Sequence, residues 1–483
     1  MFHKYLVPGL DVLIGNPSFL APGPETRPKA RRLLIPESYL YRIDDFHNEM
    51  STRGEAAKEL QTIFSEEILR RIHNEGLPYY TFKNGMQLEI VPDEKCKFTG
   101  RLNPKSSKSQ AVATALSCLD SSSRNREEMN DDPPIDASNL AVMTGSDSLA
   151  ILAYLHGIDV AMINPEVYTG RRAVELPYEL SHLWFTNHRI SPLEWKECFP
   201  NEAPLHPNEY IVFTGDYHET RNKSYKNIGR CDPESGALVP LRFTSISTEN
   251  FPTKIWPKSA GQAMAIDALM APVEEIPIVL ISGIFGTGKT FLSVASGYYQ
   301  INSGDYERIF ICPRDGTLGA DIGFLPGDAT NKTRAKAKPI EDNFLQVLKL
   351  QYSGEKRAEQ GNTGLGSAHD QFEKLIASHV IEFEPLINMG GRSIADSFII
   401  YDEFQDMERY QAKALLTRPH DTSKMVILGD PTQTTNPHLN ATSNGLSYSA
   451  SKLAGKPEAA VITLLPEEIT RSRAAIAIAK YFT

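Results

Sequence analysis

The segment "GIFGTGKT", which runs from Gly283 to Thr290, restricts the fold of this chain more than any other feature. It follows the apolar run "PIVLI", which is typical of a buried strand, and precedes "FLSVASGYY", which is typical of a helix. Glycines between a strand and a helix let consecutive backbone N–H groups curve around an anion, and the helix N-terminus adds partial positive charge. The segment therefore predicts a phosphate-binding turn in an α/β domain.

This turn fits the pattern G-x-x-x-x-G-K-[ST], the P-loop of nucleotide-binding proteins. Lys289 is expected to contact the β and γ phosphates of ATP, and the Thr290 hydroxyl to ligate Mg²⁺. The other expected contacts to the nucleotide are Gly283, Ile284, Phe285, Gly286, Thr287 and Gly288. The alternative is an unrelated glycine-rich turn, and the strand and helix on its two sides argue against that.

A second strand ends in two acids. In "FIIYDEF", the apolar residues 398–401 predict a buried strand that is followed by Asp402 and Glu403. Ligands of open α/β sheets bind at the carboxyl ends of the strands, so both acids should face the nucleotide. Asp402 is expected to hold Mg²⁺, directly or through water, and Glu403 to orient and activate the attacking water.

A third strand, "MVILGDPTQ", also ends in polar residues. Asp430 or Gln433 is expected to sense the γ-phosphate or the attacking water. The alternative is an ordinary strand followed by a type I turn at Asp430-Pro431. Superfamily-one helicases carry the motifs DExx and GDxxQ in this order, and the similar order here favours the functional interpretation.

The C-terminal region resembles the ATPase domain of the PhoH family. The motifs that carry the resemblance are "IGFLPGD" (322–328), "KPIEDN" (338–343), "DEFQD", "LLTR" (415–418), "SKMVILGDPTQ" and "SNGLSY" (443–448). The resemblance implies a RecA-like core that assembles as a homo-oligomer, a hexameric ring, with ATP bound between subunits.

The resemblance also implies roles for three residues outside the P-loop and outside the segments that follow the second and third strands. Gln262, in "GQAMAIDALM", would contact the edge of the adenine. An arginine from a neighbouring subunit would stabilise transition-state charge: Arg418 matches the "LTR" position, and Arg471 is a second candidate. For each arginine, the alternative is a surface salt bridge.

The N-terminal region resembles a PIN nuclease domain, which one PhoH subfamily carries. Such domains hold Mg²⁺ or Mn²⁺ with three or four carboxylates at strand ends. Here these acidic positions fall on Gly9, Tyr41, Ser109 and Ser146. Other carboxylates lie close by in the sequence, at Asp11, Asp44, Asp45 and Asp147. The preferred interpretation is a PIN-like fold without its metal centre, and a displaced metal site is the alternative.

The pattern of strand-like and helix-like runs along the sequence predicts an α/β protein of three regions. Residues 1–164 would form the PIN-like three-layer α/β domain and residues 165–251 a small β-rich connector, in which "NEY" at 208–210 fits the linker of the PIN-fused PhoH subfamily. Residues 252–483 would form the RecA-like P-loop ATPase with a parallel sheet.

The bulk properties narrow the setting. No apolar run reaches the roughly 18–20 residues that a membrane span needs, so no membrane partner is expected. The five cysteines are scattered, with no C-x-x-C pair, which indicates a reducing, cytoplasmic location. The net charge of −10 argues against nonspecific coating of nucleic acid, although a local basic path is compatible with it.

Two clusters of cations are candidates for such a path. One comprises Lys332, Arg334, Lys336 and Lys338, which alternate along "NKTRAKAK", and the other is "RPKARR" at 27–32. Ordinary solvated surface is the alternative for both. The favoured function is an ATP-dependent motor on single-stranded nucleic acid, expected to be RNA. The alternatives are an ATP-coupled, metal-dependent RNase and an ATP-gated RNA-binding or assembly module that unwinds nothing.

Overall fold

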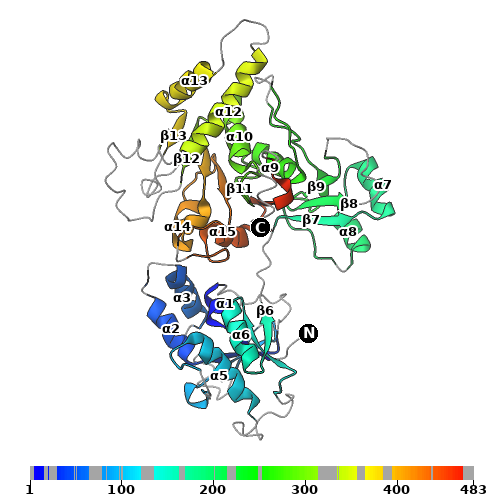
Figure 1. Cartoon of the computed structure of the whole chain (residues 1–483). Coiled ribbons are helices and arrows are strands. Elements are labelled where there is room, and N and C mark those ends of the chain that lie inside the picture. Colours follow the sequence, from blue (N-terminus) through cyan, green and yellow to red (C-terminus); the bar gives the residue numbers. More distant parts are fainter. Residues whose placement is uncertain are drawn as a thin grey trace, which may run out of the picture. The chain divides into compact units, whose positions relative to one another are not determined.

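Three β-sheets organise the part of the chain that the structure, a computed structural model, describes (Figure 1). That part comprises residues 5–15, 20, 30–47, 49, 52–64, 79–82, 84–96, 98, 102–120, 135–162, 169–200, 202–214, 225–247, 253–313, 334, 337–355, 365–383, 394–436 and 439–470. By its contacts the chain divides into two units, Met1–Glu166 and Val167–Thr483, which we describe separately.

The first unit is built on a six-stranded sheet of order β3-β4-β2-β1-β5-β6, parallel except for the β3–β4 pair. Its strands are β1 (Tyr5–Pro8), β2 (Arg32–Pro36), β3 (Tyr79–Thr81), β4 (Gln87–Val91), β5 (Leu140–Thr144) and β6 (Asp159–Met162). Its helices are α1 (Leu10–Gly15), α2 (Ser38–His47), α3 (Thr52–Ile63), α5 (Ser107–Leu119) and α6 (Asp147–Leu155), with the short 3-10 helix η2 (Asp93–Lys95). The α/β class predicted for this region is confirmed.

Arg32 corrects one expectation for this unit. Within the cluster "RPKARR" it lies in β2, and its side chain is buried. Its guanidinium donates to Gln87 and Glu89 on β4 and lies over the ring of Tyr79 on β3. Arg32 therefore joins three strands of the sheet and is not part of a surface path for phosphates.

The second unit begins with a four-stranded sheet of order β10-β9-β8-β7, which we call the accessory sheet. Its strands are β7 (Arg171–Glu175), β8 (Tyr210–Thr214), β9 (Ile228–Cys231) and β10 (Leu238–Pro240), and two helices accompany it, α7 (Tyr178–Asn187) and α8 (Pro192–Cys198). Apolar side chains of the sheet pack with Trp184 of α7 and Trp195 of α8. This is the region predicted as a β-rich connector.

The rest of this unit is built on a six-stranded parallel sheet of order β13-β12-β14-β15-β11-β16. The strands are β11 (Ile278–Gly283), β12 (Arg308–Cys312), β13 (Ile381–Phe383), β14 (Ser397–Tyr401), β15 (Lys424–Gly429) and β16 (Ala459–Leu464). The helices are α9 (Ala260–Met270), α10 (Lys289–Ser303), α12 (Lys338–Glu355), α13 (Leu365–Ala377), α14 (Arg409–Leu416) and α15 (Gly445–Leu453), with 3-10 helices η6 (Phe404–Asp406) and η7 (Pro466–Glu468).

Alternation along these strands produces three layers. In β12, Ile309 and Ile311 belong to the apolar core with α9, α10, α12 and α13, whereas Phe310 and Cys312 belong to a second core with α14 and α15. Successive side chains of a strand point to opposite faces, so a strand that is apolar throughout needs cover on both sides. The sheet is therefore enclosed between two layers of helices (Figure 1). No helix in the described ranges is both long and apolar enough to cross a membrane.

Candidate nucleotide-binding site

The glycine-rich segment forms a tight turn between β11 and α10. Gly286 and Gly288 have φ angles of 83° and 95°, in the left-handed region that favours glycine. Gly288 caps the N-terminus of α10, so the first amides of the helix open toward the turn. This is the geometry that the sequence predicted for a phosphate-binding loop.

Lys289 folds back over this turn. Its Nζ donates to the carbonyl oxygens of Gly283 at 2.5 Å and Ile284 at 3.1 Å. The ammonium group is therefore held at the mouth of the turn, where it could exchange these carbonyl oxygens for phosphate oxygens.

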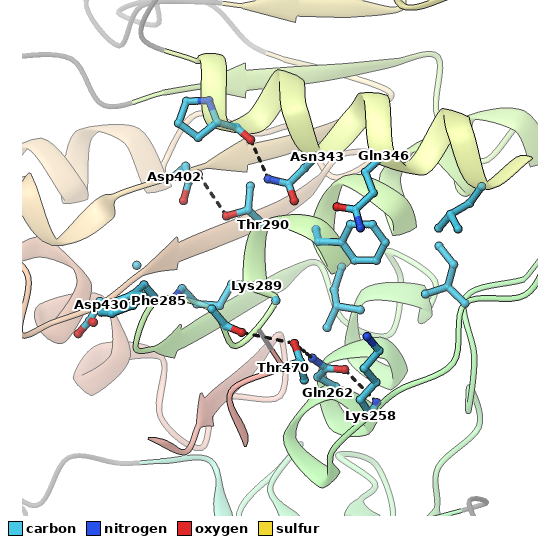
Figure 2. A pocket seen from close by; sticks show the side chains of 18 of the residues that line it. Lys258, Gln262, Phe285, Lys289, Thr290, Asn343, Gln346, Asp402, Asp430 and Thr470 are labelled. Carbon is cyan, nitrogen blue, oxygen red and sulfur yellow. Dashed lines mark hydrogen bonds between the residues drawn. The ribbon is translucent and has the colours of Figure 1, made fainter. Parts of the chain in front are cut away.

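Thr290 and Asp402 bring together the two halves of the predicted metal site. Thr290, in the first turn of α10, donates its Oγ1 proton to Oδ2 of Asp402, just after β14, at 3.4 Å (Figure 2). Burial, together with the neighbouring Glu403 carboxylate, raises the pKa of Asp402 to about 6. A cation beside Asp402 would favour its ionised form.

The oxygens at this end of the site fit Mg²⁺. The hydroxyl of Thr290 and the carboxylate of Asp402 are the hard donors that this ion prefers. Asp430 directly follows β15. This strand lies between β14, which precedes Asp402, and β11, which precedes the P-loop and Thr290. Its Oδ2 is buried and has no hydrogen-bond partner among the described residues, whereas Oδ1 accepts from the N–H and hydroxyl of Thr432.

Glu403 is held by Gln405, a residue that was not predicted to belong to the site. Its backbone has a φ of 55°, a conformation that non-glycine residues rarely adopt and that clusters at functional sites. Its Oε2 accepts from Nε2 of Gln405 at 2.6 Å, and Oε1 of Gln405 accepts from the backbone N–H of Asp430 at 3.1 Å. Nε2 of Gln405 also lies 3.4 Å from the carbonyl oxygen of Gln433. The motif "DEFQ" contained this glutamine, but its spacing alone did not reveal these three partners.

The segment after β15 forms the turn at Asp430-Pro431 that the sequence suggested as an alternative, and it also lines the pocket. The backbone N–H of Gln433 donates to the carbonyl of Asp430 at 3.1 Å, which closes the turn. Asp406 then holds the continuation of the segment, because its Oδ1 accepts from the N–H of Thr435 at 2.6 Å. The loops after β14 and β15 are thus joined by hydrogen bonds from both Gln405 and Asp406.

A pocket of about 630 Å³ extends from these loops (Figure 2). Its polar lining includes Lys289, Thr290, Asp402, Glu403, Asp430 and Gln433. Its apolar lining includes Trp256, Phe291 and Leu350, with Trp256 56% exposed. Pockets of a few hundred Å³ that combine polar groups with an apolar wall are typical of small-ligand sites. These apolar residues were not predicted from the sequence.

Gln262 lies beside the P-loop and also lines the pocket. Its Nε2 donates to the carbonyl of Thr287 at 2.8 Å, and its Oε1 accepts from the N–H of Lys258 at 2.9 Å. Both ends of the carboxamide are thus bonded within the chain. The contact with adenine that the resemblance implies stays a prediction.

Of the two candidate arginines, Arg418 lies within the described residues. Arg418 follows α14 and is half-buried, with its Nε donating to the carbonyl of Ala414 at 3.1 Å, and it is not among the described residues that line the pocket. Arg471 lies outside the described residues, as does the motif at 322–328.

The basic path predicted at 332–338 is only partly described. Lys332 and Lys336 lie outside the described residues. Arg334 is ion-paired with Glu373 and Glu341, and Lys338, the first residue of α12, pairs with Glu341 at 3.1 Å. Arg334 therefore joins α12 and α13, whereas the pair of Lys338 lies within α12.

In the first unit, two of the carboxylates near the predicted acidic positions, Asp11 and Asp44, accept hydrogen bonds from neighbouring segments. Asp11 uses its carboxylate structurally: Oδ2 accepts from Oγ1 of Thr144 and from the N–H of Gly145, both at 2.9 Å. Asp44 accepts from Gln61 at 2.6 Å. Within the ranges that the structure describes, no group of three or more His, Cys, Asp or Glu side chains could hold a metal ion.

A P-loop at the end of one parallel strand and an acid pair at the end of another define a P-loop NTPase of RecA-like fold, a nucleotide-hydrolysing class. Residues 254–483 match the family described as PhoH-like protein. Protein PhoH2 of Bacillus subtilis (strain 168) is 30% identical over 336 residues, which are 69% of this chain and 69% of that protein. The chain belongs to the PhoH-like family, and this confirms the resemblance seen in its sequence.

Other relatives match shorter stretches. A PhoH-like protein of Bacillus subtilis is 29% identical over 42% of this chain and 57% of its own length. Protein PhoH2 of Thermobispora bispora is 30% identical over 44% of each chain. The solved hexameric APS kinase from Thiobacillus denitrificans superposes with a TM-score of 0.14 at 12% identity, which carries no argument about fold or assembly.

Proposed function

We propose that this protein hydrolyses ATP with Mg²⁺ and uses the reaction to act on single-stranded nucleic acid, expected to be RNA. The observation that supports hydrolysis best is that Lys289, Thr290, Asp402 and Glu403 all line the same pocket. Nucleotide binding alone would require only the P-loop. Glu403, the second acid beside Asp402, supplies a group that can activate water for hydrolysis.

Each side chain has a part in the proposed reaction. The P-loop amides and Lys289 bind the β and γ phosphates, and the lysine gives up the carbonyl oxygens of Gly283 and Ile284 to do so. Thr290 and Asp402 would hold Mg²⁺, which neutralises charge on the phosphate oxygens when bound. Glu403 accepts the proton of the attacking water, and Gln433 orients that water.

The proposed coupling to nucleic acid depends on the loops after β14 and β15. Gln405 joins Glu403 to Asp430, and Asp406 joins η6 to Thr435. A change at the γ-phosphate would therefore move both loops together, which is the behaviour expected of a motor. We also propose that the protein assembles as a ring in which Arg418 completes a neighbouring site.

Two substitutions separate binding from hydrolysis. Lys289→Ala should abolish binding of a fluorescent ATP analogue, whereas Glu403→Gln should retain binding and lose about 10²- to 10⁴-fold in the rate of hydrolysis. Retention of hydrolysis by Glu403→Gln would contradict the proposed role of Glu403.

RNA distinguishes the motor from its rivals. Single-stranded RNA should raise the ATPase rate of the wild type, and a labelled duplex with a single-stranded tail should be unwound only when ATP is hydrolysed. A rate that is the same with and without RNA or DNA would favour a nucleotide-gated assembly module. Cleavage of the RNA that requires Mg²⁺ or Mn²⁺ would favour an ATP-coupled RNase.

A further inference from the structure

The chain segment after β16 connects three parts of the second unit through one carboxylate. Both oxygens of Glu468, which is 9% exposed, accept from Nη1 of Arg171 in β7, at 3.1 and 3.0 Å. Oε1 also accepts from the N–H of Gly261 at the start of α9, at 2.7 Å, and Oε2 from the N–H of Leu465 at 2.8 Å. The accessory sheet, α9 and η7 therefore meet at this side chain.

Two residues further on, the same segment reaches the P-loop. The backbone N–H of Thr470 donates to the carbonyl of Gly286 at 3.0 Å. Gln262, one residue after Gly261 in α9, donates to the carbonyl of Thr287 at 2.8 Å. Two successive P-loop carbonyls are thus held from outside the loop, by groups that lie next to contacts of Glu468.

These two bonds have a consequence for phosphate binding. The C=O and N–H groups of a trans peptide point in opposite directions. When the carbonyls of Gly286 and Thr287 are held outward, the N–H groups of Thr287 and Gly288 in the same peptides turn toward the inside of the loop. A phosphate-binding turn requires its N–H groups in that orientation.

The accessory sheet is attached at further points close to this segment. The N–H of Thr463 in β16 donates to the carbonyl of Thr169, just before β7, at 2.9 Å. Nδ2 of Asn208, just before β8, donates to the carbonyl of Pro457 at 2.8 Å. Because of these attachments, a displacement of β7 would be transmitted to the segment that carries Glu468 and Thr470.

We propose that Glu468, Thr470 and Arg171 are positioning residues of the nucleotide site, and that through them the accessory sheet sets the affinity of the P-loop for phosphate. The proposal rests on the proposed nucleotide binding, but not on hydrolysis or on nucleic acid. It gives the accessory sheet a regulatory role: a partner that displaces β7 lowers nucleotide affinity, and one that fixes β7 raises it.

Adjacent arginines of β7 provide a matched test. Arg171→Ala removes the bonds to Glu468. Arg172→Ala removes bonds to Glu209 and to the carbonyls of Ala203 and Pro204, in the segment between α8 and β8. The measurement is the dissociation constant of a fluorescent ADP analogue, with circular dichroism and urea unfolding to verify the fold. We expect Arg171→Ala to raise the constant about tenfold and Arg172→Ala to leave it unchanged.

Further variants show whether the effect travels through Glu468. Glu468→Gln should weaken ADP binding in the same direction, and Arg171→Lys, which keeps the charge, should lie between Arg171→Ala and the wild type. Equal constants for Arg171→Ala and the wild type would overturn the proposal, as would equal weakening by Arg172→Ala. A wild type that binds no ADP would instead overturn the proposed function.

Discussion

Nε2 of Gln405 lies 2.6 Å from Oε2 of Glu403, and the glutamine itself is fully buried. Its Oε1 faces the other way and accepts from the N–H of Asp430. A Cβ at Gly429 would lie 2.3 Å from this Oε1, so the glycine before Asp430 leaves the space that the glutamine occupies. The two motifs "DEFQ" and "GDPTQ" are therefore one hydrogen-bonded structure.

The first prediction concerns this glutamine. Gln405→Met keeps the length of the side chain but removes its three hydrogen bonds, which join it to Glu403, to the N–H of Asp430 and to the carbonyl of Gln433. Glu403 therefore loses the donor that fixes its carboxylate. Misplacement of a catalytic group by about 1 Å can cost on the order of 100-fold in rate. We expect kcat for ATP hydrolysis to fall about 10- to 100-fold with little change in KM, in steady-state assays.

Gln300→Met is the control for that substitution. Gln300 is also a buried glutamine, and it donates to the carbonyls of Leu269 and Ser296, away from the lining of the pocket. It should lose stability comparable to Gln405→Met while keeping kcat. Equal losses of kcat in the two variants would show that Gln405 acts only through stability.

The second prediction concerns Trp256, an exposed aromatic side chain that lines the pocket. Trp256→Ala should raise the KM for ATP about tenfold with kcat nearly unchanged, because stacking of a base on an aromatic ring contributes about 1–3 kcal/mol in both ground and transition states. Inhibition by tripolyphosphate, which has no base, should be the same in variant and wild type. Tyr178→Ala, at an exposed aromatic of α7 outside this pocket, is the control. An unchanged KM in Trp256→Ala would place the base elsewhere.

The third prediction concerns the buried contact between the accessory sheet and α9. Asp267, fully buried in α9, accepts from Tyr210 in β8 at 3.1 Å and from the backbone N–H of Arg242 at 2.8 Å. Arg230 in β9 lies 3.5 Å away as its ionic partner. Asp267→Asn removes the buried one of the two carboxylates beside Arg230 and leaves only the more exposed Glu275, at 3.4 Å.

Loss of one partner of a buried ion pair costs about 3–5 kcal/mol. We expect a decrease of this size in the free energy of unfolding of Asp267→Asn, measured in urea. Asp232→Asn should change stability by less than about 1 kcal/mol, because Asp232 only supports a surface turn through Ser235. If Asp267→Asn lowered the free energy of unfolding by less than Asp232→Asn does, Asp267 would not stabilise the contact.

The parts of the site that follow from the sequence are those set by local pattern. The pattern of an apolar strand, a glycine-rich turn and a helix predicted the positions of Lys289 and Thr290. Asp402 and Asp430 each follow an apolar strand, which predicted that both lie at the same edge of the sheet. Parallel strands end at a common edge, so no knowledge of distant contacts was needed.

The features that escaped prediction depend on distant segments. Trp256 precedes the P-loop strand, whereas Leu350 comes from α12 far along the chain, and only the folded structure brings them to one pocket. The bond between Arg171 and Glu468 joins residues from opposite ends of the second unit. The ion pairs and hydrogen bonds of Arg32 and Arg334 could not be predicted for the same reason, because Gln87 and Glu373 lie tens of residues away in the sequence.

The fourth prediction concerns Asp11, which lies two residues from a predicted acidic position of the first unit. A Cβ at Gly9 would lie 2.2 Å from Oδ1 of Asp11, so the aspartate occupies the space next to that position. Its Oδ2, however, accepts from the hydroxyl of Thr144 and the N–H of Gly145. These bonds connect the start of α1 to the end of β5.

If Asp11 is structural, Asp11→Ala and Thr144→Val break the same bond from its two ends. Each should lower the thermal stability of the protein, and the double variant should lose less than the sum of the single losses. A metal ligand would behave differently: Asp11→Ala and Asp147→Ala would abolish a cleavage of labelled single-stranded RNA that depends on Mg²⁺ or Mn²⁺, and Thr144→Val would not. We expect the first pattern, because the Asp11 carboxylate already satisfies two donors of the fold.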